Sequence, residues 1–160
     1  MKIKNFYSKI FHKLHECETL EIAEFSKLFE NTYRSVNISL VNEIKMFASK
    51  MKINFHNVIE AASTKPFGFT KFIPGPGTGG HCIPIDPIFI SWTAKKYKFK
   101  TKFIELSADT NKKITFWTIN KIKDFINKST KTKKLLFLGL AYKKDVNDIR
   151  ESASIKIFKK

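Results

Sequence analysis

The sequence predicts a mainly α-helical chain with one unusually long central helix, followed by the start of a smaller α/β segment. Three observations lead to this fold class. Apolar residues recur at three- and four-residue steps over about 30 positions with no Pro or Gly between them. All five prolines and five of the six glycines then fall within residues 65–87. A short apolar run ends at Gly139 and is typical of a buried parallel strand.

The central helix is predicted to begin at about Thr19 and to continue to about Met51. Its apolar side chains form one stripe, which needs a partner along its length, either within the chain or from a second copy. A helix this long is unusual where the mean is about 11 to 12 residues. The stripe consists of Ile22, Phe25, Phe29, Tyr33, Val36, Leu40, Ile44, Phe47 and Met51.

Shorter elements are predicted on both sides of this helix. Residues 1–18 are basic and aromatic without a clean period, so part of them reads as the end of a strand or a frayed helix. A short helix carries Phe55, Val58, Ile59 and Ala62 on one face. Residues 65–87 form a long loop, and loops of that length are usually functional.

Two more helices are expected after the loop, at 88–97 and 103–127, the second with Ile114, Trp117, Ile122, Phe125 and Ile126 as its stripe. A polar connection at 127–133 leads to the predicted strand at 135–138. The last ten residues are expected to start a further helix that is still open at the end of the chain, which suggests a truncation.

Composition excludes several classes of protein. No apolar run approaches the roughly 18 to 20 residues of a membrane span, and no leader-like segment opens the chain. Cys17 and Cys82 cannot form a disulfide framework, so we expect a cytoplasmic protein. The net charge is +16, but Arg34 and Arg150 are the only arginines, and Lys, Ile, Phe and Asn all have AT-rich codons. Genome bias therefore explains much of the charge, and we expect no nucleic-acid partner.

The loop contains a literal G-x-G-x-x-G at Gly75, Gly77 and Gly80. A dinucleotide fingerprint requires a strand before it and a helix directly after it. Here Pro84 prevents immediate helix continuation. We therefore favour a tight backbone wrap around a group that must come close.

A candidate nucleophile, Cys82, follows this wrap, with Asp86 four residues later. A thiol fixed near a carboxylate and helix amides suits nucleophilic catalysis, whereas the alternative is a small buried cysteine. We expect no metal site. His81 and Cys82 are adjacent and cannot easily share one ion, and the three candidate ligands near the N-terminus, His12, His15 and Cys17, lack a fourth.

Three ordered segments resemble the UDP-glucose/GDP-mannose dehydrogenase family. FIPGPGTGGHCIPIDPIFISWTAKKY is similar to its active-site loop, in the form typical of the UDP-N-acetylhexosamine branch, in particular UDP-N-acetylglucosamine 6-dehydrogenases. AEFSKLFENTYRSVNISLVNEI resembles the central helix. LLFLGLAYKKDVNDIRES resembles the start of the C-terminal nucleotide-sugar-binding domain. The resemblance covers about residues 16–160.

The resemblance implies a fold and a reaction. The fold would be a helical dimerisation domain with a long central helix, followed by the first strand and helix of a truncated Rossmann-like α/β domain. Residues 1–18 would be the remnant of an NAD-binding domain, 19–110 the central domain with the cysteine loop, and 111–160 the start of the UDP-sugar domain. Such enzymes oxidise the sugar C6 alcohol to a carboxylate with two NAD per turnover, and serve nucleotide-sugar and polysaccharide biosynthesis.

The resemblance also assigns residue roles. Cys82 would attack the C6 aldehyde and form a thioester. Lys27 and Asn31, four residues apart on one helix face, would stabilise the oxyanion. Asp86 would orient or deprotonate the attacking group. Without the family context, Lys27 and Asn31 read as surface residues and Asp86 as a turn cap. The expected substrate-binding residues are Arg34, Gly75, Gly77, Gly79, Gly80, His81, Lys143 and Arg150.

The sequence departs from the family at both ends. The 160 residues hold no strand followed by a glycine-rich turn and an acidic ribose ligand, so the NAD-binding residues are unknown. The chain therefore reads as a gene fragment, a frameshift product or one half of a split enzyme. The expected partners are the UDP-sugar, a second copy through the long helix, and a separately encoded NAD-binding half. The alternative function is a catalytically inactive dimerisation module, and the chain alone is expected to be inactive.

Overall fold

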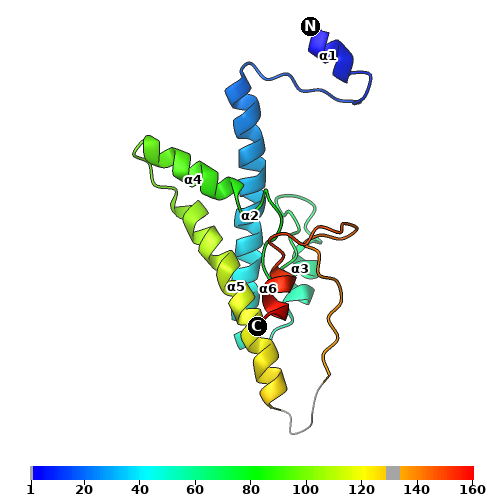
Figure 1. Cartoon of the computed structure of the whole chain (residues 1–160), viewed down its shortest axis with the longest axis vertical. Coiled ribbons are helices and arrows are strands. Elements are labelled where there is room, and N and C mark those ends of the chain that lie inside the picture. The colour runs from blue at the N-terminus through cyan, green and yellow to red at the C-terminus, as the bar shows by residue number, and fades with distance from the viewer. Residues whose placement is uncertain (1, 129–133) are drawn as a thin grey trace.

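The computed structural model describes residues 2–128 and 134–160, and these ranges contain helices but no β-strand (Figure 1). The mainly helical class is confirmed. The predicted polar connection at 127–133 lies outside the described residues beyond Lys128. The helices are α1 (Lys2–Tyr7), α2 (Leu20–Lys50), α3 (Phe55–Ala62), α4 (Asp86–Lys96), α5 (Lys102–Asn127) and α6 (Ala153–Phe158).

Helix α2 begins where the sequence places it. The Thr19 side chain caps it by accepting a hydrogen bond from the Ile22 amide at 3.3 Å. The helix ends at Lys50, and Lys52 then adopts a left-handed φ of 59° that turns the chain toward α3. The predicted long helix is thus confirmed within one residue at each end.

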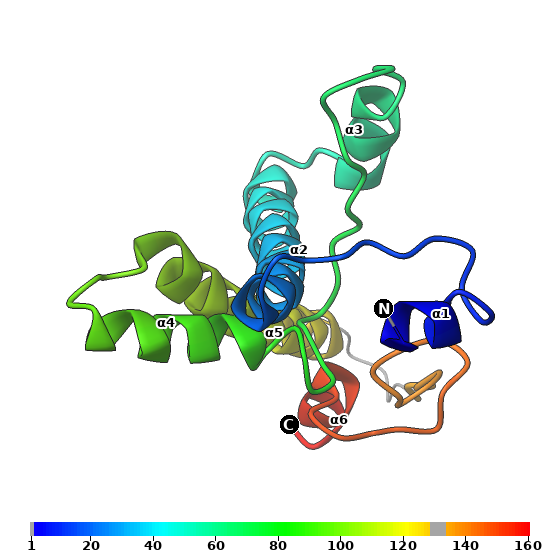
Figure 2. The ribbon, with the colours of Figure 1, turned by 90° about the horizontal axis from the view of Figure 1, so that it is seen from above.

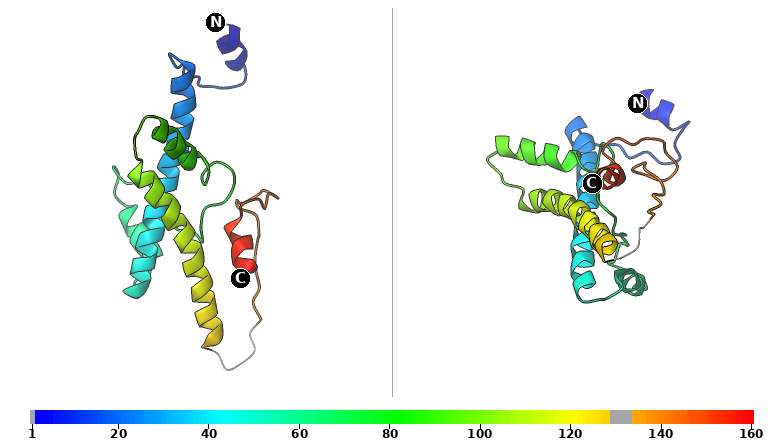
Figure 3. Two further views of the ribbon diagram at one scale, coloured as in Figure 1. Left: turned by 60° about the vertical axis from the view of Figure 1, so that its left-hand side comes forward. Right: turned by 60° about the horizontal axis from the view of Figure 1, so that its bottom comes forward.

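The helices pack around α2 rather than around a shared apolar centre. Helix α5 runs along α2, α4 lies against both, and α3 folds back on the C-terminal end of α2 (Figures 1 and 2). Helix α6 contacts α5, whereas α1 contacts no other described helix and projects from the end of α2 (Figure 3). The one small apolar cluster joins Ala48 of α2 to Phe55 and Ile59 of α3.

The face of α2 that packs within the chain is polar. Its buried residues are Asn31, Thr32, Ser35, Ser39, Asn42 and Ala48. The predicted apolar stripe lies on the other side of the helix and is largely exposed, with Phe29 at 62% and Leu40 at 55%. Tyr33 packs edge-on against Phe72 within the chain, with ring centroids 5.9 Å apart. Most of the stripe is left uncovered by the described residues, and a second copy is the partner expected for it from the sequence.

The exposed surface is large for the size of the chain. A compact monomer of 18.6 kDa has about 8,200 Å² of accessible surface. This chain has 13,109 Å². The excess indicates that much of the surface is shaped to be covered by other polypeptide.

One predicted element is not observed. Residues 134–140 have no regular secondary structure, and Leu136 and Leu138 are 83% and 84% exposed instead of buried. A strand forms only when its backbone groups pair with a neighbour, and the described residues offer none. The expected first strand of a Rossmann-like domain is therefore not confirmed. The helix expected near the C-terminus is α6, which ends at Phe158 instead of remaining open.

No helix in the described ranges is long and apolar enough to cross a membrane.

Candidate active site

The glycine-rich loop is anchored to the helices at two points. At the first, Asn42 Oδ1 of α2 accepts a hydrogen bond from the Gly75 amide at 3.0 Å. On the next residue, the Pro76 carbonyl accepts one from Thr115 Oγ1 of α5 at 2.8 Å. At the second point, Asn31 Nδ2 of α2 donates to Asp86 Oδ2 at 2.6 Å. The segment with Cys82 lies between these anchors.

At three glycines of the loop, neighbouring atoms of the chain leave no room for a side chain. Gly77 has a φ of +138°, and a Cβ there would lie 2.4 Å from Thr115 Oγ1. A Cβ at Gly79 or Gly80 would lie 2.7 Å from atoms of Tyr142. Any side chain at these positions would push the loop away from α5 or from the 140–151 segment.

The candidate nucleophile lies in a turn just before α4. The Cys82 carbonyl accepts hydrogen bonds from the amides of Ile85 at 3.1 Å and Asp86 at 2.8 Å, and α4 begins at Asp86. Pro87 in the first turn of α4 suits a helix start because its missing amide proton has no partner there. The Cys82 side chain is exposed, as is that of His81. The thiol is thus accessible at the helix N-terminus, and the alternative of a buried cysteine is not observed.

The cationic residues of α2 near Asn31 are tied to one carboxylate. Lys27 Nζ donates to Glu30 Oε2 at 2.9 Å, and Arg34 donates to Glu30 Oε1 at 3.0 Å. The hydrogen bond from Lys27 lowers the pKa of Glu30. Lys27 lies one turn before Asn31, as expected, but the contact it makes in this structure is with Glu30. The structure therefore brings Asn31, Asp86 and the Cys82 turn together and leaves Lys27 at their edge.

The C-terminal segment packs on the loop through Tyr142, next to the predicted residue Lys143. Tyr142 packs on Gly79 and Gly80, and its amide donates to the Asp148 carbonyl at 3.3 Å. Arg150 makes a two-pronged pair with the Asp148 carboxylate at 3.0 and 2.8 Å. Hydrogen bonds from Arg150 lower the pKa of Asp148 to about 2. Lys143 is exposed, beside a shallow hollow formed by residues 139–146.

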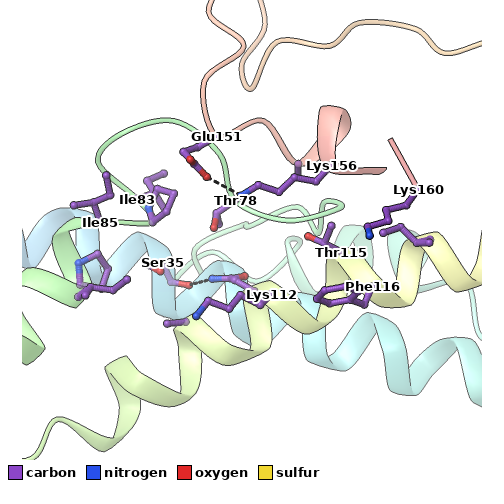
Figure 4. A pocket seen from close by; sticks show the side chains of 17 residues that line it. Ser35, Thr78, Ile83, Ile85, Lys112, Thr115, Phe116, Glu151, Lys156 and Lys160 are labelled. Atoms are coloured by element: carbon purple, nitrogen blue, oxygen red, sulfur yellow. Dashed lines mark hydrogen bonds and ion pairs between the residues drawn. The ribbon is translucent and has the colours of Figure 1, made fainter. Parts of the chain in front are cut away.

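A separate cavity of about 620 Å³ lies behind the Cys82 turn (Figure 4). Its walls come from the turn at Ile83–Pro87, from α5 and from α6, and they are mostly apolar. Lys112, Lys156 and Lys160 stand at its edge, and Lys156 is paired with Glu151 at 2.7 Å. Cys82 does not line this cavity, so we do not assign it as the reaction site.

Sequence reasoning missed the residues that hold the loop, namely Asn42, Asn111 and Thr115. The signal was present in the spacing of α2. Asn31, Ser35 and Asn42 repeat at steps of four and seven and so form a polar stripe opposite the apolar one. An analysis that follows only hydrophobic periodicity passes over such a stripe.

The described residues provide neither a metal site nor an NAD site of the Rossmann type. Residues 2–128 and 134–160 contain no cluster of three or more His, Cys, Asp or Glu that could hold a metal ion. NAD sites of the Rossmann type need a strand, a glycine-rich turn and a helix N-terminus in succession. No such succession exists in the described ranges, so these residues do not fit the cofactor.

Comparison with known proteins defines the class. Residues 21–113 match the description "UDP-glucose/GDP-mannose dehydrogenase family, central domain". The chain belongs to this family and carries the central domain of a nucleotide-sugar dehydrogenase. The resemblance inferred from the three motifs is thereby confirmed at the level of the family.

Individual relatives with similar sequences are named for one activity. The chain is 41% identical over 138 residues to a UDP-N-acetyl-D-mannosamine dehydrogenase of Methanocaldococcus jannaschii, covering 86% of this chain and 31% of that protein. The corresponding enzyme of Escherichia coli K12 is 33% identical over 142 residues, covering 84% and 33%. The structure of the UDP-N-acetyl-mannosamine dehydrogenase Cap5O from Staphylococcus aureus matches with a TM-score of 0.81 and 34% identity, over 99% of this chain and 35% of that one.

These findings correct one expectation. The sequence pattern was assigned to UDP-N-acetylglucosamine 6-dehydrogenases, whereas the matched relatives are UDP-N-acetylmannosamine dehydrogenases. The two sugars differ only at C2, and the motifs contain no residue that identifies the C2 configuration, so they could not separate the two. The chain spans about a third of the length of these relatives.

Proposed function

We propose that this chain is the catalytic central part of an NAD-dependent UDP-N-acetylmannosamine 6-dehydrogenase, which oxidises the C6 alcohol of the sugar to a carboxylate. The observation that supports the proposal is the Asn31–Asp86 hydrogen bond, because it fixes the start of α4 on the central helix. The exposed Cys82 lies in the turn just before that start, where its carbonyl accepts from the Asp86 amide. The matched relatives supply the substrate class.

The chain's own residues account for the sugar side of the reaction. The C6 alcohol must first lose a hydride and a proton to become the aldehyde, and NAD would be the acceptor of that first hydride. The Cys82 thiolate then adds to the aldehyde carbon, and the carbonyl oxygen becomes an oxyanion. Asn31 donates a hydrogen bond to that oxygen, and Lys27 supplies positive charge once it leaves Glu30. Oxidation of the adduct to a thioester needs a hydride acceptor, which in this family is NAD. Water then cleaves the thioester, with Asp86 accepting the proton of the water.

The substrate-binding residues form a second group in the proposal. Lys143 and Arg150 lie on the segment that packs over the loop, where they can meet the diphosphate of a UDP-sugar. Gly77, Gly79 and Gly80 offer backbone amides to the sugar, whereas the Gly75 amide is held by Asn42 and Gly75 only lets the backbone come close. Arg34 and His81 are further substrate-binding residues in the proposal. We also propose that residues 19–110 form the central domain. Residues 1–18 would belong to the NAD-binding domain and residues 111–160 to the UDP-sugar domain.

We also propose the partners and the setting. A second copy covers the apolar stripe of α2, and a separately encoded polypeptide supplies the NAD-binding domain. The protein acts in the cytoplasm, in nucleotide-sugar metabolism. An upstream reading frame that encodes a glycine-rich Rossmann domain would support this assembly, and its absence would favour the second candidate.

The second candidate function is a dimerisation module without turnover. One observation favours it: the large apolar surface in need of a partner is the α2 stripe rather than the loop. In that case the loop would keep its shape, since its glycines and anchors hold it without substrate.

Replacing the thiol separates the two candidates. Cys82→Ser in a complete or complemented enzyme should abolish formation of the uronic acid. Serine would have to form an ester in place of the thioester, and that ester is not formed and hydrolysed as readily. Cys17→Ser is the matched control, since Cys17 lies outside the loop. Undiminished acid formation by the Cys82 variant would defeat the proposed mechanism. A complemented wild-type complex that binds NAD yet makes no acid would support the dimerisation module.

A further inference from the structure

The buried polar face of α2 contains a continuous hydrogen-bonded chain that reaches the loop. Asn42 is 0% exposed, and its Nδ2 donates to Asn111 Oδ1 of α5 at 3.1 Å. Asn111, 6% exposed, donates in turn to the Ser35 carbonyl at 3.3 Å (Figure 4). The Oδ1 of Asn42 receives the Gly75 amide. One side chain thus connects two helices and the loop.

Asn42 is closed to water, yet its side-chain oxygen and one of its two amide protons are hydrogen-bonded. A buried polar group costs free energy when it loses its partner, so Asn42 and Gly75 have few alternatives to this pairing. A loop can slide on an apolar surface at little cost. It cannot slide away from a buried amide without leaving donors and acceptors unpaired.

We propose that Asn42 and Asn111 are positioning residues that fix the Gly75–Cys82 segment on the helices and thereby set the reactivity of the Cys82 thiol. The inference rests on the proposed role of Cys82 as the nucleophile. Neither residue touches the reacting atoms in this structure. Their action passes through the backbone, from the Gly75 anchor on one side of Cys82 to the Asn31–Asp86 anchor on the other.

The first measurement needs no variant. The Gly75 amide of the 160-residue chain should exchange with solvent deuterium at least about tenfold more slowly than that of Gly79, since one buried hydrogen bond has about that effect on local opening. The Gly79 amide donates no hydrogen bond within the described residues and serves as the internal reference. Equal protection at the two glycines would overturn the proposal whether or not any variant folds.

The second measurement uses Asn42→Ala, with Asn37→Ala as the matched control. Asn37 lies on the same helix, and its side chain donates to the Tyr33 carbonyl rather than to the Gly75–Cys82 segment. In Asn42→Ala, protection at Gly75 should fall about tenfold, and the rate of Cys82 alkylation relative to Cys17 should change by about threefold or more. In Asn37→Ala both should stay at the wild-type value. A folded Asn42→Ala variant that behaves as wild type would contradict the proposal.

A conservative variant distinguishes positioning from packing. In Asn42→Asp, burial raises the pKa of the introduced carboxyl group, and its protonated form can accept from Gly75 and donate to Asn111 as the amide does. The ionised form cannot donate to Asn111, and a charge in this buried position favours opening of the site to water. Protection at Gly75, corrected for intrinsic exchange, should therefore recover as the pH falls. A packing role predicts no such recovery, so a flat profile counts against positioning. None of these readouts uses NAD or a sugar, so they stand apart from the outcome of the Cys82→Ser assay.

Discussion

The exposed stripe of α2 makes a quantitative prediction for Leu40→Glu. Leu40 lies near the middle of the helix and is 55% exposed in the single chain. Full burial of a leucine is worth about 1.5–3 kcal/mol, so burying the exposed half of Leu40 contributes about 1–1.5 kcal/mol per copy. At a two-fold interface the substitution removes this burial free energy from both copies, so the dimer loses about 2–3 kcal/mol. The dissociation constant should rise about 30- to 100-fold, since 1.4 kcal/mol is a factor of ten.

Leu20→Glu is the matched control. It is the same substitution in the same helix, but Leu20 is the first residue of α2, lies off the stripe and is 80% exposed. A glutamate in the first turn also suits the helix dipole, so the control should associate as wild type does.

Sedimentation equilibrium over the micromolar range measures all three proteins, with circular dichroism to establish that the helices persist. Two results would refute the reasoning. One is a well-folded wild-type monomer across that range. The other is a folded Leu40→Glu variant with the wild-type dissociation constant, which would place the interface elsewhere.

Two further outcomes follow from the site. The 160-residue chain alone should show no micromolar NAD binding by calorimetry and no steady NADH production with UDP-N-acetylmannosamine, because its described residues do not fit the cofactor; either signal without an added partner would show that the site was misjudged. The Asp148–Arg150 pair should persist down to low pH, because the pKa of Asp148 is lowered to about 2. Its contribution is present above the ordinary carboxyl pKa and disappears as the pH falls through about 2. An NMR titration of the Asp148 carboxyl with a midpoint at the ordinary value would show that the pair does not form in solution.

The sequence predicted the helices well because their signals are local. The expected spans at 19–51 and 103–127 lie within one or two residues of α2 and α5, and Thr19 caps α2 as its residue type suggests. The loop and its cysteine were also located correctly, since prolines and glycines mark such segments clearly. These features depend on neighbours in the chain rather than on distant partners.

The remaining errors have one physical origin. The run at 135–138 was read as a buried strand because its residues suit one, yet a strand exists only with a neighbour to pair with. Hydropathy located the apolar stripe of α2. It gave no sign that the opposite face of the helix packs within the chain through amide and hydroxyl side chains. The Asn42–Asn111 contact joins residues 69 positions apart, and no local pattern specifies it.

The inverted character of α2, polar inside and apolar outside, has a thermodynamic consequence. When the apolar face of α2 is buried only by a second copy, that burial stabilises the folded chain only in the dimer, so folding and association are coupled. The thermal midpoint of the chain should then rise with protein concentration, and no single free energy of unfolding describes the monomer. Dilution alone would shift such a chain toward unfolded states, so the cellular amount of the protein sets how much of it is folded.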